Sequence, residues 1–232
     1  MTIICTICAR GGSKGVPRKN VRMIAGAPLI VHTLRHAIAM NRFNQIAVSS
    51  DDQAVLDIAE TNGATMTVLR PAELSRDESD KLSAIRHCVN FVEAQIGKVN
   101  IVVDLDVTAP LRTVGDITSA IRLLEESQCD NVITATRARR SPYFNMIEKQ
   151  ADDSIDLVKR TPMQVVRRQD SPEVFDMNAS IYVWRRDALF NRETVIHQGT
   201  RMLEMPPERS LDIDSELDFQ VVEFLLNQRG SH

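Results

Sequence analysis

Short apolar runs alternate with longer stretches of helical periodicity through most of this 232-residue chain. An apolar run at 3–8 precedes a periodic segment at 28–40, and a second run at 45–49 precedes another periodic segment that ends near Gly63. A third apolar run follows at 65–69. Strands and helices in this alternating order predict a parallel sheet with helices packed on its faces.

The alternation continues toward the C-terminus with one interruption. Further strands are predicted at 99–105, 131–136, 179–184 and 201–205. Further helices are predicted from about 79 to 96, from Thr113 or Asp116 to about Ser127, after Asp187, and from about Ser215 to Asn227. Residues 137–177 lose the helical periodicity and interleave basic residues with aromatic and acidic ones. We expect a single domain, 1–232, in which 137–177 is an excursion of irregular or antiparallel strands. A solvated flap is the alternative.

Composition and charge exclude several classes of protein. A net charge of −3 leaves no general basic field, so we expect no nucleic-acid partner. No apolar run approaches the roughly 20 residues of a membrane span, and Met1-Thr2 leads straight into the first strand without a signal peptide. We therefore expect a cytoplasmic protein that does not contact a membrane. Four cysteines fit a reducing compartment, and no second cysteine pair or nearby histidine completes a zinc site with Cys5 and Cys8.

A glycine-rich cationic segment, 9–20, follows the first predicted strand. It contains Gly11, Gly12 and Gly15 together with Arg10, Lys14, Arg18 and Lys19. It matches neither the P-loop, which needs a Gly-Lys-Ser/Thr triplet, nor the dinucleotide fingerprint G-x-G-x-x-G. Glycines allow the backbone to approach an anion that the cations surround, at the place where open α/β sheets bind ligands. The segment predicts a polyphosphate-binding loop, and a solvated surface connection is the alternative.

Acidic residues near the C-terminus complement this loop. Ser215 with Asp218 matches a capping box at the start of the last helix, which explains the acidity locally. The capping box does not explain Asp212 and Asp214. In an extended segment these two residues lie on one face, where both carboxylates can bind Mg²⁺. A cationic loop and acids that hold a divalent ion indicate a Mg²⁺-dependent nucleotidyl or phosphoryl transferase.

Residues 9–20 also contain every fixed position of the pattern A-R-x-x-S-K-G-x-x-x-K-N. The segment resembles the N-terminal signature of the acylneuraminate cytidylyltransferases, the CMP-sialic acid synthetases. Four later segments resemble that family in the family's order: 68–74, 108–113, 178–182 and 212–218. The resemblance implies an α/β fold, the three-layer Rossmann-like nucleotide-diphospho-sugar transferase fold, with a mainly parallel central sheet. It also implies that 137–177 is a small dimerisation extension that lends residues to the sugar site of a partner subunit.

The implied reaction uses CTP and Mg²⁺ to activate a nine-carbon α-keto acid sugar, giving a CMP-sugar and pyrophosphate, in a homodimer. The implied nucleotide-binding residues are Ala9, Arg10, Gly11, Ser13, Lys14, Lys19, Asn20 and Arg70. The implied catalytic residues are Arg10, Lys14 and Asp212, and the implied metal ligands are Asp212 and Asp214. The implied sugar-binding residues are Asp106, Phe144, Arg168, Asn178 and Tyr182.

Three positions depart from the sialic-acid-activating members. Asp106 replaces a glutamine, Phe144 a lysine, and Lys81 a serine that often faces the base. The first two changes resemble the branch acting on legionaminic-type 5,7-diamino sugars, because Phe144 suits a less polar sugar and Asp106 can accept from an N-acyl N–H. Asp104 and Asp106 form a second D-x-D that could serve either the metal or the sugar. The competing functions are a nucleotidyltransferase that activates a sugar 1-phosphate with UTP or GTP, and a non-catalytic nucleotide-binding protein.

Overall fold

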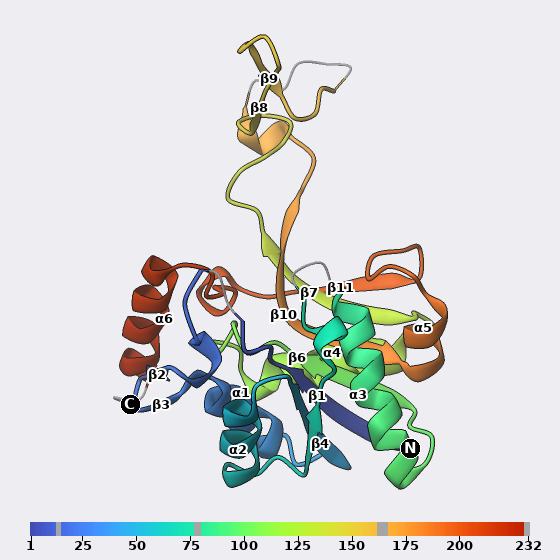
Figure 1. Cartoon of the computed structure of the whole chain (residues 1–232). Coiled ribbons are helices and arrows are strands. Elements are labelled where there is room, and N and C mark those ends of the chain that lie inside the picture. The colour runs from blue at the N-terminus through green and yellow to red at the C-terminus, as the bar shows by residue number, and fades with distance from the viewer. Residues whose placement is uncertain (13–14, 77–79, 162–166, 230–232) are drawn as a thin grey trace.

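The computed structural model describes residues 1–12, 15–76, 80–161 and 167–229, and within them a seven-stranded sheet forms the centre of the molecule (Figure 1). The strand order is β11-β7-β10-β6-β1-β4-β5. The strands are β1 (Ile3–Cys8), β4 (Gln45–Ser50), β5 (Met66–Leu69), β6 (Ile101–Leu105), β7 (Asn131–Arg137), β10 (Phe175–Arg185) and β11 (Thr200–Glu204). A two-stranded hairpin, β2 (Met23–Ile24) and β3 (Ala27–Pro28), lies outside this sheet.

The sheet is mainly parallel, as the sequence predicts. β1 pairs in parallel with β4 and β6, β4 with β5, and β7 with β11. Within the seven-stranded sheet, as far as the structure describes it, only β10 runs antiparallel to its neighbours, β6 and β7. It does so because the chain leaves the sheet at the end of β7 and returns along β10, and a chain that turns back beside its own strand pairs with it in antiparallel fashion.

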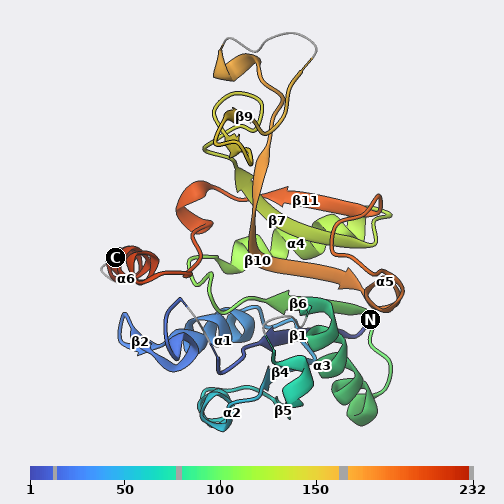
Figure 2. The ribbon, with the colours of Figure 1, turned by 45° about the horizontal axis from the view of Figure 1, so that its top comes forward.

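Helices cover both faces of the sheet and make three layers (Figures 1 and 2). They are α1 (Leu29–Ala39), α2 (Gln53–Thr61), α3 (Lys81–Ile96), α4 (Val114–Glu126), α5 (Arg186–Asn191) and α6 (Glu216–Arg229). Successive residues of a strand point to opposite faces. Cys5 and Val103 accordingly join the apolar cluster of α1, α2 and α4, whereas Ile4 and Val102 join the cluster of α3 and α5. No helix of the described residues is both long and apolar enough to cross a membrane.

Side-chain caps fix where several helices begin. Asp80 caps α3 by accepting from a backbone N–H, so the helix begins slightly later than the sequence predicts. Thr113 and Asp116 form a capping box at α4. At α6 the predicted box is present, because Ser215 Oγ donates to Asp218 at 2.7 Å and the Asp218 N–H donates back to Ser215 Oγ at 3.2 Å. These caps place the loops that precede α3 and α6, both of which reach the site described below.

The predicted excursion is an extension that projects from one edge of the sheet (Figures 1 and 2). It carries the antiparallel strands β8 (Ile147–Lys149) and β9 (Ile155–Leu157). At its base the pairing of β10 with β7 shifts between Met177 and Tyr182, and Ala179 adopts a φ of 51°. Residues 162–166 of the extension lie outside the described residues.

Candidate active site

A cavity of about 300 Å³ lies at the carboxyl ends of the parallel strands, where open α/β sheets bind ligands. The glycine-rich loop after β1 forms one wall, and the residues after β5 and β6 and the first turn of α3 form the others. The charged and polar lining side chains come from different parts of the chain and include Arg10, Lys19, Asn20, Arg70, Lys81 and Asp106. The fold therefore brings together five residues that were predicted to bind nucleotide or sugar, and it adds Lys81.

Hydrogen bonds to the neighbouring strand ends hold the glycine-rich loop. The buried Ala9 donates its N–H to the Ser49 carbonyl at 2.9 Å, and the Gly11 N–H donates to Asp51 Oδ1 at 2.8 Å. Asn20 Nδ2 closes the loop by donating to the Arg10 carbonyl at 2.8 Å. The predicted residues Ser13 and Lys14 lie outside the described residues.

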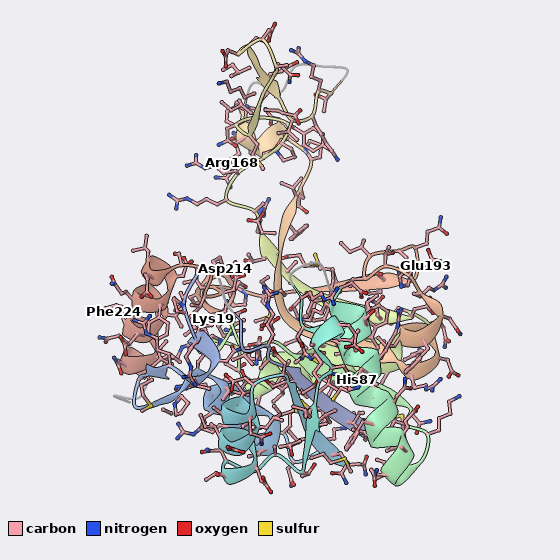
Figure 3. All side chains as sticks on the ribbon, in the orientation of Figure 1. Lys19, His87, Arg168, Glu193, Asp214 and Phe224 are labelled. Atoms are coloured by element: carbon pink, nitrogen blue, oxygen red, sulfur yellow. The ribbon has the colours of Figure 1, made fainter. Side chains whose placement is uncertain are left out.

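The far side of the loop touches the segment that carries the predicted metal ligands (Figure 3). A Cβ on Gly15 would lie 1.8 Å from the carbonyl oxygen of Asp214, so only glycine fits there. Lys19 Nζ donates to the Ile213 carbonyl at 2.6 Å and lies 3.5 Å from Asp214 Oδ1. Ile213 is buried, and its N–H donates to the Thr108 carbonyl at 2.9 Å. Lys19 therefore ties the loop to the acidic segment 194 positions away in sequence.

The electrostatics of Asp212 and Asp214 suit a cation. Burial raises the pKa of Asp212, and the negative charge of Asp214 raises it further. The side chain of Asp214 is 78% exposed. In the part of the chain that the structure describes, no three His, Cys, Asp or Glu side chains gather as a complete metal cage. Mg²⁺ is commonly held by one or two carboxylates together with waters and substrate phosphates, and this pair fits that donor set.

Asp104 and Asp106 face a lysine. Lys81 Nζ lies 3.3 Å from Asp104 Oδ2 and 2.8 Å from Asp106 Oδ2. Burial raises the pKa of Asp104. It opposes ionisation of Asp106 as well, but the Lys81 charge and hydrogen bonds from Lys81 and Thr108 hold the pKa of Asp106 well below its usual range. Two acids at the end of a buried strand are costly unless a cation compensates their charge, and Lys81 supplies that cation.

A second buried cation, Arg112, lies behind Asp106. Its side chain is 1% exposed and donates to Ser180 Oγ at 3.0 Å, to Thr33 Oγ1 at 3.2 Å and to the Asp106 carbonyl. Burial lowers its pKa to about 10, so the guanidinium stays charged at neutral pH. Sequence reasoning missed this role of Arg112. The run Pro110-Leu111-Arg112 carries no sign of the side chains that the arginine contacts after folding.

Replacing Arg112 with methionine is expected to lower the free energy of unfolding by about 3 kcal/mol, because three buried acceptors lose their donor and the nearby acids lose a counter-charge. Urea unfolding followed by circular dichroism measures this. Arg122→Met is the matched control on α4, where an exposed pair 4.0 Å from Glu126 contributes less than about 0.5 kcal/mol. An unchanged urea midpoint for Arg112→Met would contradict the structural role.

Two of the predicted sugar-binding residues are buried close to the cavity. Asn178 Oδ1 accepts from Thr134 Oγ1 at 2.7 Å, and its Nδ2 donates to Ser210 Oγ at 3.0 Å. The ring of Tyr182 lies 4.1 Å from Lys81 Nζ and is 3% exposed. Both side chains are held by protein contacts, and their sugar-binding roles stay predictions.

The other two, Phe144 and Arg168, lie on the extension. Arg168 Nη2 donates to the Ala138 carbonyl at 3.0 Å and lines a separate cavity of about 360 Å³ with Arg137 and Arg140. In Figure 3 Arg168 is far above Lys19 and Asp214 in the body of the molecule. Among the described residues that line the cavity there is neither Phe144 nor Arg168 of the chain's own extension.

The fold has counterparts among solved structures. The structure of CMP:2-keto-3-deoxy-manno-octonic acid synthetase complexed with CTP matches 99% of this chain and 100% of that chain, with a TM-score of 0.70 at 18% identity. The 4-diphosphocytidyl-2C-methyl-D-erythritol synthase of Anaerococcus prevotii matches 100% of this chain and 99% of that chain, with a TM-score of 0.62 at 14% identity. The molecule thus has the nucleotide-diphospho-sugar transferase fold that the sequence resemblance implies.

The family follows from sequence. Residues 4–220 match the model of the cytidylyltransferase family, and the chain belongs to that family. It is 39% identical over 229 residues to the CMP-N,N'-diacetyllegionaminic acid synthase of Campylobacter jejuni and to the post-translational flagellin modification protein B of Campylobacter coli, covering 98% of this chain and 96% of each relative. It is 33% identical to N-acylneuraminate cytidylyltransferase A of Danio rerio, over 95% of this chain and 50% of that relative.

Proposed function

We propose that this cytidylyltransferase uses CTP and Mg²⁺ to activate a nine-carbon α-keto acid sugar of the legionaminic or sialic type. The anomeric hydroxyl of the sugar attacks the α-phosphorus, the bond to the β-phosphate breaks, and a CMP-sugar and pyrophosphate are formed. The observation that carries the proposal is the contact of the glycine-rich loop with the acidic segment at Gly15, Lys19 and Asp214. Transfer between phosphates requires alignment and charge neutralisation, and this contact unites the groups that supply both.

The loop would hold the triphosphate. Arg10, Lys14 and Asn20 would bind its oxygens, and Arg10 or Lys14 would stabilise the charge that develops at the α-phosphate. Ala9, Gly11 and Ser13 would shape the loop around the triphosphate, with Ala9 and Gly11 anchored by their N–H groups to Ser49 and Asp51. Lys19 would act at the same loop by keeping the acidic segment against it, as its bond to the Ile213 carbonyl supports.

Arg70 would border the pocket for the base and ribose. It is 6% exposed, and its guanidinium donates to Ser49 Oγ at 3.2 Å and to the Ser49 carbonyl at 2.8 Å, so its orientation is fixed before a ligand arrives. Asp212 and Asp214 would bind Mg²⁺, which orients the phosphates and lowers the pKa of the attacking hydroxyl.

The sugar would be of the legionaminic type, with an apolar contact from Phe144 and an acceptor at Asp106. The name of the 39%-identical Campylobacter jejuni relative supports this choice. Phe144 and Arg168 would act in the site of a partner subunit, with Arg168 meeting the sugar carboxylate. Their place on the projecting extension is consistent with a homodimer that shares its sites in this way. We expect the enzyme to work in the cytoplasm, where CTP is available.

The function is tested by incubating the purified protein with Mg²⁺, each of CTP, UTP, GTP and ATP, and a panel of acceptors, with pyrophosphate release as the readout. The panel contains N,N'-diacetyllegionaminate, N-acetylneuraminate and hexose 1-phosphates. Of the four nucleotides, we expect only CTP to support turnover. Of the acceptors, we expect N,N'-diacetyllegionaminate to give the highest kcat/KM. Equal or better turnover of N-acetylneuraminate would refute the choice of sugar. Turnover of a sugar 1-phosphate with UTP or GTP, or CTP binding without any turnover, would refute the proposed reaction.

A further inference from the structure

One wall of the cavity carries a charged group that the proposed reaction does not use. Lys81, in the first turn of α3, reaches across to the two carboxylates at the end of β6. Its side chain is 28% exposed and lines the same cavity as Arg10 and Arg70. A lysine here would ordinarily suggest a phosphate ligand, but its contacts point to a different task.

The ammonium ion of Lys81 is fully engaged within the protein. An ammonium ion has three donors and no acceptor. Lys81 Nζ donates a hydrogen bond to Asp106 Oδ2 at 2.8 Å. Asp104 Oδ2 lies 3.3 Å away as an ion-pair partner without a hydrogen bond, and the centre of the Tyr182 ring lies 4.1 Å from the nitrogen. Burial opposes its charge, but the two carboxylates outweigh burial and raise the pKa of Lys81 above its usual value. Lys81 therefore remains charged and faces the acids at neutral pH.

Asp106 keeps one free acceptor position. An ionised carboxylate offers about four lone-pair sites. Lys81 takes one on Oδ2, and the Thr108 N–H and Oγ1 both donate to Oδ1 at 3.0 Å. The side chain of Asp106 is 23% exposed and lines the cavity, whereas that of Asp104 is 1% exposed and accepts from Thr6 Oγ1 at 2.8 Å. Of the two acids, only Asp106 can meet a substrate.

We propose that Lys81 is a positioning residue for the sugar: it occupies the place between Asp104 and Asp106 that a divalent metal would otherwise take, and so aims the free acceptor of Asp106 at an amide N–H of the substrate. The proposal rests on the proposed function, because it takes the sugar to carry an acylamino group. It assigns the second D-x-D to the sugar and leaves the metal to Asp212 and Asp214.

The charges around Lys81 agree with this assignment. Asp104 and Asp106 are balanced by Lys81 in front and by Arg112 behind, whose charge acts on the same acids. The two carboxylates and the two cations give these four side chains a net charge close to zero without a metal. A divalent ion that displaced the ammonium ion from both carboxylates would leave one positive charge in excess, and one that bound beside it would leave two.

The first test separates positioning from charge balance. Lys81→Met leaves an uncompensated acid that can impair folding, so Lys81→Met/Asp104→Asn is made beside it to remove one charge of each sign. We expect the double variant to have the same midpoint of urea unfolding as the wild type. Its KM for N,N'-diacetyllegionaminate should rise about 10-fold, the loss of roughly one charged hydrogen bond, while its KM for CTP changes less than 2-fold. The control is Lys98→Met, which removes an exposed ion pair with Asp187. We expect its KM values for the sugar and for CTP to be unchanged.

The second test uses Mn²⁺ alone and needs no turnover. Titration followed by electron paramagnetic resonance should find one more Mn²⁺ bound per chain of Lys81→Met than of the wild type, and no such increase for the double variant. A wild-type sugar KM in the double variant would overturn the proposal. So would a loss of bound Mn²⁺ on changing only Asp104 to asparagine, because Asp104 would then be a metal ligand. Absence of wild-type turnover with every α-keto acid sugar is a separate result, which refutes the proposed function itself.

Discussion

Replacing Gly15 with alanine is expected to lower kcat/KM for CTP and sugar by about 100-fold or more. The added Cβ would lie 1.8 Å from the Asp214 carbonyl, a distance at which the loop and the acidic segment must move apart. A displacement of about 1 Å in a site that works by alignment costs on the order of 100-fold in rate. Pyrophosphate release under saturating Mg²⁺ measures the loss, and the effect should fall on kcat as well as on KM because both parts of the site shift.

The control for Gly15→Ala is Gly115→Ala in α4. There the nearest atom to an added Cβ is Thr113 Oγ1 at 3.5 Å, an ordinary contact distance. Alanine favours a helix over glycine, so this variant should be more stable by about 0.5–1 kcal/mol and have unchanged activity. Wild-type kcat/KM in Gly15→Ala would mean that the loop does not need to touch the acidic segment during turnover.

Replacing Asp212 with asparagine is expected to reduce kcat by about 100- to 1,000-fold and to raise the Mg²⁺ concentration needed for half-maximal rate. The carboxylate is half-buried beside the like charge of Asp214, and a metal ion relieves the repulsion that raises its pKa. If Asp212 is one of the two proposed protein ligands of the metal, its loss removes several kcal/mol of charge stabilisation. Initial rates across a Mg²⁺ titration measure both changes.

Asp106→Asn provides the comparison for Asp212→Asn. It makes the same change of a carboxylate to an amide, but Asp106 lines the cavity and has Lys81 as its partner. We expect a normal Mg²⁺ requirement and a raised KM for the sugar. A higher Mg²⁺ requirement for Asp106→Asn than for Asp212→Asn would reverse the assignment of the two acidic pairs.

Local signals in the sequence predicted the framework of the fold. The apolar period, the cap at Ser215 and Asp218, and the glycine-rich segment after β1 each depend on residues close together in the chain, so they can be interpreted before folding. The family resemblance supplied the fold class, the expected reaction and a set of site residues. The structure brings Arg10, Lys19, Asn20, Arg70 and Asp106 into one cavity.

Long-range contacts could not be predicted in this way. The sequence shows that Asp104 and Asp106 are close together in the chain. It does not show that Lys81, the first residue of α3, provides their positive partner. It gives no sign that Arg112 passes behind the same acids, or that Lys19 binds a backbone carbonyl instead of facing only the cavity. Such contacts depend on how strands and helices are placed relative to one another, which local periodicity does not determine.

The bond between Lys19 and Ile213 also has a consequence for the timing of biosynthesis. The two partners are 194 positions apart in sequence, so the bond cannot form until residue 213 has emerged from the ribosome. The sheet around β1, β4 and β6 is complete much earlier. A nascent chain can therefore have a formed scaffold and a glycine-rich loop while it still lacks the acids that would complete the site. Activity would appear only after residues 212–214 have been made, and a chain stalled before residue 212 would remain inactive even with most of its strands in place.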